Sequence, residues 1–397
     1  MTQDAEMKTI YLKRGRERRI QGGHPWVYRG EVWKIEGTLE GGEEVKILDY
    51  RGKFIGRGFA NPRSIISVRV VSRNDEDIDE QVFMDKLQKA KKRRDKLTVD
   101  SDAMRLVFSE ADYLPGLIVD RYGETIVVQF LTMGMDLRKK MITALIDAVF
   151  SPRTIYERSD VRVREHEGLE RIKGDLKGAL PEKLVVTMGG LKYIVDIKNG
   201  QKTGLFLDQR ENAILAGSQI TDGDVLDCFS YSGSFGMQAL KNGARHATFV
   251  EISEDAVRST KQNLEINGLS DRATFITSNA FDMLKQYDRS GTTFDMVILD
   301  PPSFTRSKKS LEGARRGYKE INLRGIKILR PGGTLITSTC SQHLAHDLFE
   351  DIVREAAQDA RVSSQLLYCS EQAKDHPMLL EVPETRYLCC IFLRKEE

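Results

Sequence analysis

From about residue 185 onward, short apolar runs alternate with helix-like segments, and this alternation constrains the fold more than any other feature. Strands are expected at 224–229, 247–251, 274–277, 295–299 and 334–338. Helices are expected to begin at 235 and to cover 255–267 and 318–329. Strands that alternate with helices are typical of a parallel sheet with helices on both faces. We therefore predict one α/β domain over 186–397.

Two further regions precede this domain. Short apolar runs at 45–49, 54–59 and 66–70, separated by glycine-containing turns, predict a small β-barrel or sandwich over 1–75. An amphipathic helix over 79–97, a hairpin over 118–130 and a helix over 135–150 predict a mixed α/β region over 76–185. The chain of 397 residues is long enough for these three parts, because domains commonly contain about 100–200 residues.

Cysteine usage and hydropathy exclude several classes of protein. The five cysteines are odd in number and scattered, which disfavours a disulfide framework, a zinc site or an iron–sulfur cluster. No run approaches the roughly 20 apolar residues of a membrane helix, and the N-terminus is too polar for a signal peptide. We expect a cytoplasmic protein with no metal and no membrane contact.

Charge is concentrated locally. The whole chain has a formal net charge of only +2, but residues 1–75 contain 15 Lys and Arg against 10 Asp and Glu. Lys13, Arg14 and Arg16 lie shortly before Trp26. Cations beside an aromatic ring suit the phosphates and bases of RNA. The alternative interpretation is a solvated charged face with Trp26 in the core.

The segment 225–236, VLDCFSYSGSFG, contains the most specific motif. A buried strand with an acidic residue, Asp227, leads through Phe229 and Ser230 to a small-residue loop that opens a helix. Gly233 permits close approach of the backbone to a ligand, and the helix start offers unpaired N–H groups. The pattern is not GxGxxG and no phosphate-binding lysine follows, so a dinucleotide site or P-loop is disfavoured.

Three later strands end in residues that fit the same ligand. Glu251 can accept hydrogen bonds from ribose hydroxyls. Asn279 and Ala280 lie where an amide and the following aromatic could meet an adenine, and Asp300 begins the string DPPSF. The order of these four features resembles the class I S-adenosylmethionine (SAM)-dependent methyltransferases, which implies a Rossmann-like fold with SAM as its cofactor.

Cys340 follows the fifth strand of this domain. A thiolate that attacks C6 of a cytosine makes C5 nucleophilic enough to accept a methyl group, and Asp300 could bind N3 and the exocyclic amine. The alternative is that Cys340 is a small buried apolar residue. Cys228, Cys389 and Cys390 are interpreted as packing residues. His343 could assist proton transfer or be structural.

Eight strings extend the resemblance over essentially the whole chain. They are HPWVY at 24–28, YERSD at 156–160, KTGLFLDQR at 202–210, CFSYSG at 228–233, DPPSF at 300–304, RGYK at 316–319, TCS at 339–341 and DHP at 375–377. With them the chain resembles the RlmI-type large-subunit (23S) ribosomal RNA cytosine-C5 methyltransferases, which carry an N-terminal PUA domain.

The resemblance implies a PUA fold for 7–73 and a middle domain that contributes to the RNA surface. It also implies that the segment with Phe206, Gln209 and Arg210 closes over SAM and that Cys340 is the attacking thiol. The same 208–210 segment could instead be structural. Many RNA cytosine-C5 methyltransferases have a second cysteine where this chain has Ser303, so the base that releases the product is not identified.

A basic insertion over 305–319 follows the DPPSF string. Pro302, Phe304, Arg315 and Arg316 are expected to contact RNA, with Arg306, Lys308, Lys309 and Lys319 adding charge. The alternative is a mobile solvated loop.

We therefore predict a SAM-dependent methyltransferase that forms 5-methylcytosine in ribosomal RNA. Three other functions stay open at this point: methylation of a purine nitrogen, methylation of uracil C5, and a non-catalytic RNA-binding assembly factor. A homodimer is retained as a candidate assembly, although the sequence does not determine the oligomeric state.

Overall fold

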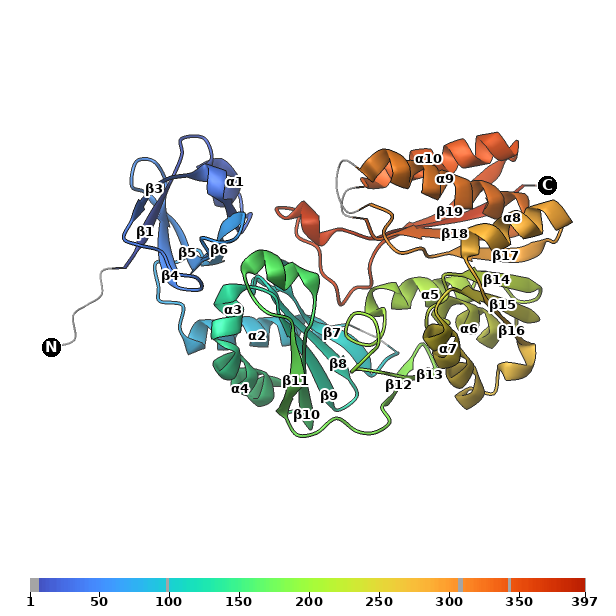
Figure 1. Cartoon of the computed structure of the whole chain (residues 1–397), viewed down its shortest axis with the longest axis horizontal. Helices are drawn as coiled ribbons and strands as arrows, with labels where there is room; N and C mark the ends of the chain where they lie inside the picture. The colour runs from blue at the N-terminus through green and yellow to red at the C-terminus, as the bar shows by residue number, and fades with distance from the viewer. Residues whose placement is uncertain (1–6, 98–99, 306–309, 342–343, 397) are drawn as a thin grey trace. The chain divides into compact units, whose positions relative to one another are not determined.

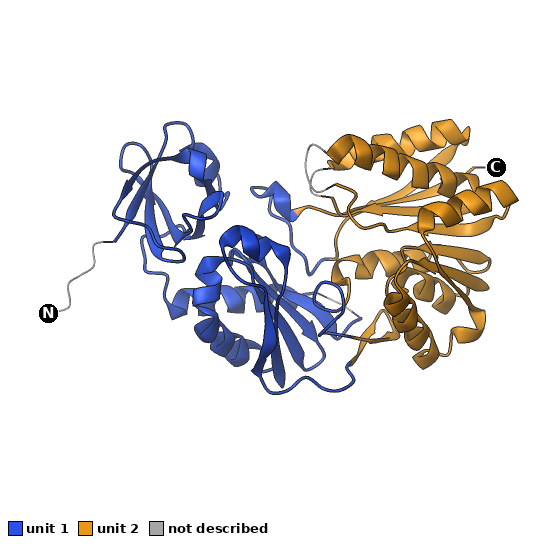
Figure 2. Ribbon diagram, viewed as in Figure 1, with its two compact units in different colours: residues 1–184, 196–204, 374–385 blue, residues 185–195, 205–373, 386–397 orange. Residues whose placement is uncertain are grey.

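The computed structural model describes residues 7–97, 100–305, 310–341 and 344–396. The chain divides into two compact units, coloured separately in Figure 2. Unit 1 comprises residues 1–184, 196–204 and 374–385, and unit 2 comprises 185–195, 205–373 and 386–397. Each unit is therefore built from segments that are distant in the sequence.

Unit 1 begins with a six-stranded sheet. Its elements are β1 (Thr9–Leu12), α1 (Glu17–Gln21), β2 (Trp26–Tyr28), β3 (Val32–Glu36), β4 (Glu44–Leu48), β5 (Phe54–Ala60) and β6 (Ile66–Ser72). The strand order is β2-β6-β5-β4-β1-β3, and only β1 and β4 pair in parallel. Alternate residues such as Ile10, Val45, Ile47 and Val68 form the core, as the period of two requires. The all-β prediction omitted α1, a five-residue helix that buries Ile20.

A five-stranded sheet forms the rest of unit 1. Its elements are α2 (Glu80–Arg94), β7 (Ala103–Phe108), β8 (Leu117–Tyr122), β9 (Thr125–Phe130), α3 (Met133–Leu137), α4 (Lys139–Phe150), β10 (Thr154–Ser159) and β11 (Ile172–Lys177). The order is β11-β10-β9-β8-β7, and α2 and α4 contribute Phe83, Leu87, Ile142 and Ile146 to its core. The single helix expected over 135–150 is interrupted at Arg138, whose φ of −102° and ψ of 10° are not helical.

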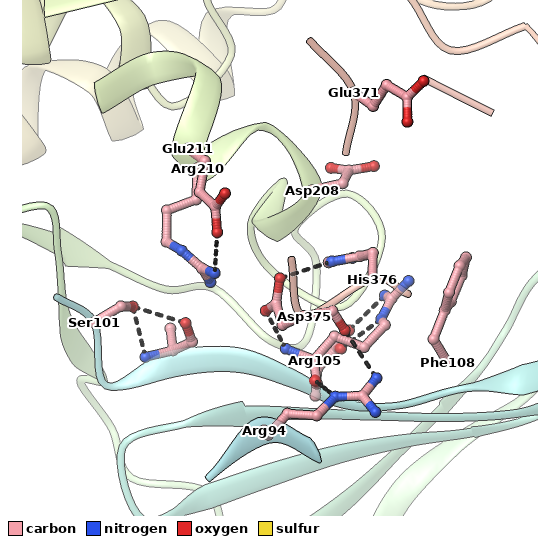
Figure 3. A network of polar contacts seen from close by, with 12 residues as sticks. Arg94, Ser101, Arg105, Phe108, Asp208, Arg210, Glu211, Glu371, Asp375 and His376 are labelled. Carbon is pink, nitrogen blue, oxygen red and sulfur yellow. Dashed lines mark hydrogen bonds and ion pairs between the residues drawn. The ribbon is translucent and has the colours of Figure 1, made fainter. Parts of the chain in front are cut away.

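A polar network fastens segment 374–385 into unit 1 (Figure 3). Arg94 binds both carboxylate oxygens of Asp112, at 2.6 and 2.7 Å, and donates to the backbone carbonyl of Asp375 at 2.8 Å. The Asp375 side chain accepts from the backbone N–H of Arg105 at 2.8 Å and lies 3.0 Å from His376 Nδ1. The buried charge of Arg94 is thus paired within one unit, as burial of a charge requires.

Unit 2 contains the alternating strands and helices that the sequence predicts. Its elements are β12 (Val185–Met188), β13 (Leu191–Ile194), α5 (Arg210–Gly217), β14 (Asp224–Cys228), α6 (Ser234–Lys241), β15 (His246–Glu251), α7 (Glu254–Ile266), β16 (Ala273–Thr277), α8 (Ala280–Ser290), β17 (Phe294–Leu299), α9 (Leu311–Lys327), β18 (Leu329–Thr339), α10 (His346–Ala360), β19 (Ser364–Ser370) and β20 (Cys389–Lys395).

The main sheet of unit 2 has the order β16-β15-β14-β17-β18-β20-β19. Strands β14 to β18 pair in parallel, whereas β20 is antiparallel to both β18 and β19. Helices α5, α6 and α7 cover one face and α8, α9 and α10 cover the other (Figure 1). The sheet confirms the Rossmann-like fold class. Among the described residues, no helix is long and apolar enough to cross a membrane.

Helix α9 begins earlier than predicted, at Leu311 instead of 318. Ala314, Tyr318 and Ile321 are buried at helical spacing, and Leu311 packs against the same core. The alternative interpretation of 305–319 as a mobile solvated loop is therefore wrong from residue 311 onward. Intervening basic residues obscured the apolar period.

Candidate cofactor and catalytic site

The loops that carry the predicted residues emerge at one edge of the unit 2 sheet. Cys228 at the end of β14 is opposite both Val250 in β15 and Leu299 in β17, and Leu299 is also opposite Thr337 in β18. The carboxyl ends of these parallel strands therefore lie side by side at one edge of the sheet. The residues that follow or close these strand ends are Phe229, Glu251, Asn279, Asp300 and Cys340. The chain reverses its order between β14 and β17, where α/β sheets bind their ligands.

The loop after β14 is held in an unusual backbone conformation. Phe229 and Tyr231 have φ of 61° and 45°, and Gly233 has φ of 77°. Left-handed φ at a non-glycine residue costs on the order of 1 kcal/mol, and such costs are typical of ligand sites. A Cβ on Gly236 would lie 2.4 Å from the Phe249 ring, so only glycine allows α6 to start this close to β15.

Asp227 is a buried carboxyl beneath this loop. It is 1% exposed, and its Oδ2 accepts a 2.9 Å hydrogen bond from the backbone N–H of Gly236. The pKa of Asp227 is raised to about 8, mainly by burial and in smaller part by the charges of Asp300 and Glu251. A cationic ligand beside such a carboxyl would stabilise its ionised form.

Glu251 is largely occupied by the protein. Its carboxylate accepts from the backbone N–H groups of Tyr231, Ile252 and Ser253 at 3.1, 2.9 and 3.0 Å. A carboxylate offers about four acceptor sites, so about one remains for a ribose hydroxyl. The contact expected of Glu251 is therefore restricted to a single hydrogen bond.

Asn279 is the N-cap of α8. Its Oδ1 accepts from the backbone N–H of Phe281 at 2.9 Å, which leaves the exposed amide nitrogen as a donor. Ala280 is buried beneath it.

The loop after β14 also fits a polar cofactor. In the part of the chain that the structure describes, Ser230 Oγ is buried and has no hydrogen-bond partner. A buried hydroxyl without a partner is costly and is explained by a ligand that supplies one. SAM combines polar groups with positive charge, so Ser230 and Asp227 are both consistent with that cofactor.

Asp300 is oriented by a chain of side-chain amides. Gln209 Nε2 donates to Asp300 Oδ1 at 2.8 Å, and Gln209 Oε1 accepts from Asn212 Nδ2 at 2.7 Å. Asn212 Oδ1 in turn accepts from Ser370 Oγ at 2.8 Å. Because both ends of the Gln209 amide have partners, its nitrogen must face Asp300. Gln209, predicted from the resemblance as a cofactor residue, thus also contacts the predicted catalytic carboxylate.

The remaining residues of this segment belong to unit 2, where Asp208 and Arg210 are buried and Phe206 is half-buried. Asp208 accepts from Tyr387 Oη at 2.7 Å, and Phe206 packs edge-on against Tyr231 with ring centroids 5.0 Å apart. Arg210 is 3% exposed, and its Nη2 lies 3.8 Å from Glu211 Oε1 (Figure 3). The direct contacts with SAM predicted for Phe206, Gln209 and Arg210 stay predictions.

Cys340 follows the last residue of β18 and is half-buried. None of the five cysteines, all of which the structure describes, forms a disulfide. Burial raises the pKa of Cys390 to about 12 and that of Cys228 well above its ordinary value. Both are therefore poor nucleophiles, in agreement with their interpretation as packing residues. Gln342 and His343 lie outside the described residues.

The cationic residues predicted to bind RNA lie in unit 1, in the turn between β1 and α1. Lys13, Arg14 and Arg16 are exposed, and the Arg14 guanidinium lies 5.7 Å from the Tyr50 ring. Trp26 is half-buried, and its indole N–H donates to Glu110 at 2.8 Å. Another tryptophan, Trp33, is 61% exposed. The sequence did not suggest it as an RNA contact, because it is not next to the basic cluster.

The other predicted RNA contacts lie beside the loop after β17. Pro302 is exposed, whereas the Phe304 ring packs at 4.5 Å from that of Tyr318. Arg315 forms an ion pair with Glu355 on α10, while Arg316 is exposed. Arg306, Lys308 and Lys309 lie outside the described residues. All of these RNA contacts stay predictions.

Sequence reasoning missed several hydroxyl groups around Cys340. Ser303 Oγ lies 2.7 Å from Ser341 Oγ, and Tyr318 Oη lies 3.2 Å from Ser341 Oγ and 2.8 Å from Thr339 Oγ1. All four residues belong to strings quoted for the resemblance, but nothing in a single sequence indicates that their hydroxyls meet.

Two family models match this chain. A PUA-like domain matches residues 10–73, and an S-adenosylmethionine-dependent methyltransferase model matches 153–379. Proteins named ribosomal RNA large subunit methyltransferase I are similar over nearly the whole length. That of Cronobacter sakazakii is 40% identical over 96% of this chain and 97% of its own, and that of Aliivibrio fischeri MJ11 is 42% identical over 96% and 97%.

Solved structures agree in fold. A candidate SAM-dependent methyltransferase from Streptococcus mutans superposes with a TM-score of 0.83 at 20% identity, covering 97% of this chain and 99% of that one. A candidate methyltransferase complexed with SAH superposes with a TM-score of 0.84, at the same identity and the same coverage.

Proposed function

This chain belongs to the family of ribosomal RNA large subunit methyltransferase I proteins, and from this premise we propose that it methylates C5 of a cytosine in 23S ribosomal RNA through a covalent adduct on Cys340. It is a SAM-dependent methyltransferase of ribosomal RNA. The target base, the covalent step and the residue roles are our proposal.

The position of Asp300 and Cys340 on neighbouring strand ends is the observation that carries the proposal. β17 and β18 pair in parallel with Leu299 opposite Thr337, and the two loops that follow are joined by the 2.7 Å contact between Ser303 and Ser341. A carboxylate and a thiol on adjacent loops can address one pyrimidine from two sides.

The covalent step begins at the thiolate of Cys340. Its sulfur forms a bond to C6, and the C5=C6 electron pair moves to C5, which becomes nucleophilic. Bound SAM supplies the methyl group for C5. A base then takes the C5 hydrogen, the C5=C6 pair re-forms, and the S–C6 bond breaks to return the thiolate. Asp227 and Ser230 would hold the cofactor beneath the loop.

Asp300 supports cytosine over uracil as the target. Its ionised carboxylate can only accept hydrogen bonds, as it does from Gln209 Nε2. Cytosine presents an exocyclic amine donor at C4, whereas uracil presents a carbonyl acceptor there. An acceptor facing that position favours cytosine.

We propose that the three parts 1–75, 76–185 and 186–397 divide the work into RNA binding, RNA positioning and methyl transfer. The exposed cations Lys13, Arg14 and Arg16 support the first role. We also propose that the protein acts in the cytoplasm, where ribosomal RNA of bacteria is found.

For the assembly we propose a homodimer. Edge strand β19 supports it, because Leu366 and Tyr368 on that strand are 53% and 45% exposed. Sedimentation of the full chain would test it, and a monomer at all concentrations would contradict it.

The test is methyl transfer from labelled SAM to unmodified large-subunit ribosomal RNA, with the nucleoside products identified by mass spectrometry. Wild type should form 5-methylcytosine, Cys340→Ala should form none, and Cys369→Ala, which removes an exposed thiol of the same unit, should match wild type. RNA containing 5-fluorocytosine should trap a covalent complex only where Cys340 is present.

Other results would select the alternatives. A methylated purine, or near-normal activity of Cys340→Ala, would contradict the covalent mechanism. 5-Methyluridine would contradict the role given to Asp300. Failure to bind SAM in calorimetry would leave only an RNA-binding factor.

A further inference from the structure

A chain of hydroxyl groups surrounds Cys340 and is not explained by any role assigned above. Thr339 Oγ1 lies 2.8 Å from Tyr318 Oη, which lies 3.2 Å from Ser341 Oγ. Ser341 Oγ lies 2.7 Å from Ser303 Oγ, which donates to the backbone carbonyl of Thr305 at 2.8 Å. These groups come from α9 and from the loops after β17 and β18.

The direction of donation along this chain follows from counting hydrogens. Each hydroxyl has one hydrogen, and a carbonyl oxygen can only accept. Ser303 gives its hydrogen to the carbonyl of Thr305, so it must accept from Ser341. Ser341 must then accept from Tyr318, which in turn accepts from Thr339. Each hydroxyl therefore donates to one defined acceptor, and all the hydrogen bonds in the series run in the same direction.

Three of the four hydroxyl residues are buried, and Ser303 is half-buried. Tyr318 is fully buried, and Thr339 and Ser341 are 1% and 2% exposed. Burial raises the pKa of Tyr318, which keeps its hydroxyl protonated and able to donate. Hydrogen bonds among groups that exclude water are stronger and more restrictive than those at a surface.

Tyr318 itself is fixed by aromatic packing. Its ring lies between Phe304, with centroids 4.5 Å apart, and Phe349 on α10, with centroids 5.4 Å apart. A negative charge on Cys340 would raise the pKa of Tyr318, so the phenol and the thiol are electrostatically close. The hydroxyl of this rigid ring therefore forms hydrogen bonds with both residues that flank Cys340 in the sequence, Thr339 and Ser341.

We infer that Tyr318 is a positioning residue for the reaction: its hydroxyl fixes the Cys340 loop against the Asp300 loop, so that the thiol and the carboxylate reach the same pyrimidine. This inference rests on the proposed role of Cys340. It assigns no chemical step to Tyr318, and it concerns only the distance and orientation of two reacting groups on separate loops.

The same series of hydrogen-bonded hydroxyls also suggests a role for Ser303, which occupies the position where many related enzymes have a second cysteine. The hydrogen of Ser303 is committed to Thr305 and one of its lone pairs to Ser341. We therefore assign Ser303 to the connection between the loops and not to removal of the C5 proton.

The main test is Tyr318→Phe, which keeps the ring and removes only the hydroxyl. In a single-turnover assay with saturating SAM and RNA, the rate of methyl transfer should fall about 10- to 100-fold, as expected when reacting groups are displaced by a fraction of an ångström to an ångström. The rate of covalent capture by 5-fluorocytosine RNA should fall by the same factor. The dissociation constant for SAM should be unchanged.

Matched variants separate positioning from a general loss of structure. Tyr287→Phe removes a half-buried phenol on α8 and should leave both rates at wild-type values. Thr339→Val removes the first hydroxyl of the chain and should reproduce Tyr318→Phe, whereas Thr339→Ser keeps that hydroxyl and should retain the wild-type rates. If Tyr318→Phe does not fold, as judged by its melting temperature, the Thr339 pair decides the question.

Wild-type rates for Tyr318→Phe, or equal losses in Thr339→Val and Thr339→Ser, would overturn the inference. Reduced SAM affinity in step with reduced activity would overturn it too, because it would indicate damage to the cofactor site. Cys340→Ala distinguishes this failure from that of the proposed function: if that variant still methylates RNA, the covalent mechanism is wrong whatever Tyr318 does.

Discussion

Among single residues, Asp227 is a carboxyl whose pKa lies close to neutral pH. It is fully buried, and its one hydrogen bond from Gly236 does not offset the cost of removing its charge from water. Its pKa of about 8 compares with an ordinary value near 3.8. In the folded protein Asp227 therefore binds a proton that the unfolded chain has already released at neutral pH.

This difference predicts how stability changes with pH. Because the folded state holds the extra proton between about pH 4 and pH 8, the free energy of unfolding should fall as pH rises through that window, by at most about 1.4 kcal/mol per pH unit for one proton. Asp227→Asn, which can still accept from Gly236, should show a weaker decline. Denaturant unfolding of ligand-free protein at pH 5, 6, 7 and 8 measures both.

The matched control is Asp255→Asn, which alters a carboxyl exposed at the start of α7. The free energy of unfolding of this variant should decline with rising pH as steeply as that of wild type. Identical slopes for wild type and Asp227→Asn would show that Asp227 ionises normally. SAM at saturating concentration should reduce the slope if the cofactor places positive charge beside Asp227.

The residue scale also shows where sequence reasoning ends. The positions of Asp227, Glu251 and Asp300 at strand ends could be predicted, because strand ends and small-residue loops are local patterns. The contact of Gln209 with Asp300 could not, because the two are 91 positions apart and meet only through tertiary packing. The hydrogen bonds of the Tyr318 hydroxyl could not be predicted from the sequence for the same reason.

At the scale of elements, α9 depends on a close approach to the sheet. A Cβ on Gly325 would lie 3.1 Å from both Leu299 and Leu335, side chains of β17 and β18. A larger residue there must push the helix away from the two strands that lead to Asp300 and Cys340. The helix also carries Tyr318, so its distance from the sheet matters for the site as well as for stability.

Gly325→Leu should therefore destabilise unit 2 by about 1–3 kcal/mol, the usual cost of overpacking a core. The methyl-transfer rate should fall as well. Gly313→Ala is the matched control on the same helix: no neighbouring atom lies within 4 Å of the added Cβ, and alanine favours a helix by up to about 1 kcal/mol over glycine. Thermal unfolding and the single-turnover rate measure both effects, and a Gly325→Leu variant as stable as wild type would contradict the packing argument.

The elements themselves were largely predictable, and their boundaries were not. The strands and helices from 224 to 339 follow apolar periods that a single sequence displays. The start of α9 was misplaced because basic residues on its outer face, such as Arg315 and Arg316, resemble a loop in composition. The break between α3 and α4 was missed because residues on both sides of Arg138 favour a helix.

At the scale of the whole molecule, the charge is distributed unevenly. The net charge of +2 conceals a first region with five more basic than acidic residues over 1–75. RNA binding through that region should weaken with salt, because bound phosphates release counterions.

Arg14→Ala and Arg16→Ala should each weaken RNA binding and reduce the slope of log Kd against log salt by about 1, without changing SAM affinity. Arg354→Ala, which removes an exposed arginine paired with Asp351 on α10, is the control and should leave the slope unchanged. Filter binding or fluorescence anisotropy between about 50 and 300 mM salt, roughly a sixfold range around physiological ionic strength, provides the measurement. Equal slopes for all variants would remove these arginines from the RNA surface.

The return of segment 374–385 to unit 1 has a consequence for how the protein is made. The hydrogen bond from Arg94 to the backbone carbonyl of Asp375 can form only after Asp375 has been synthesised, 281 positions further along the chain. A ribosome that adds about 5–20 residues per second needs roughly 15–55 s to bridge that gap. During this time Arg94 can pair with Asp112, but its hydrogen bond to the carbonyl of Asp375 is missing. Unit 1 therefore cannot be completed until translation is almost finished, and a stalled or truncated product would lack its last segment.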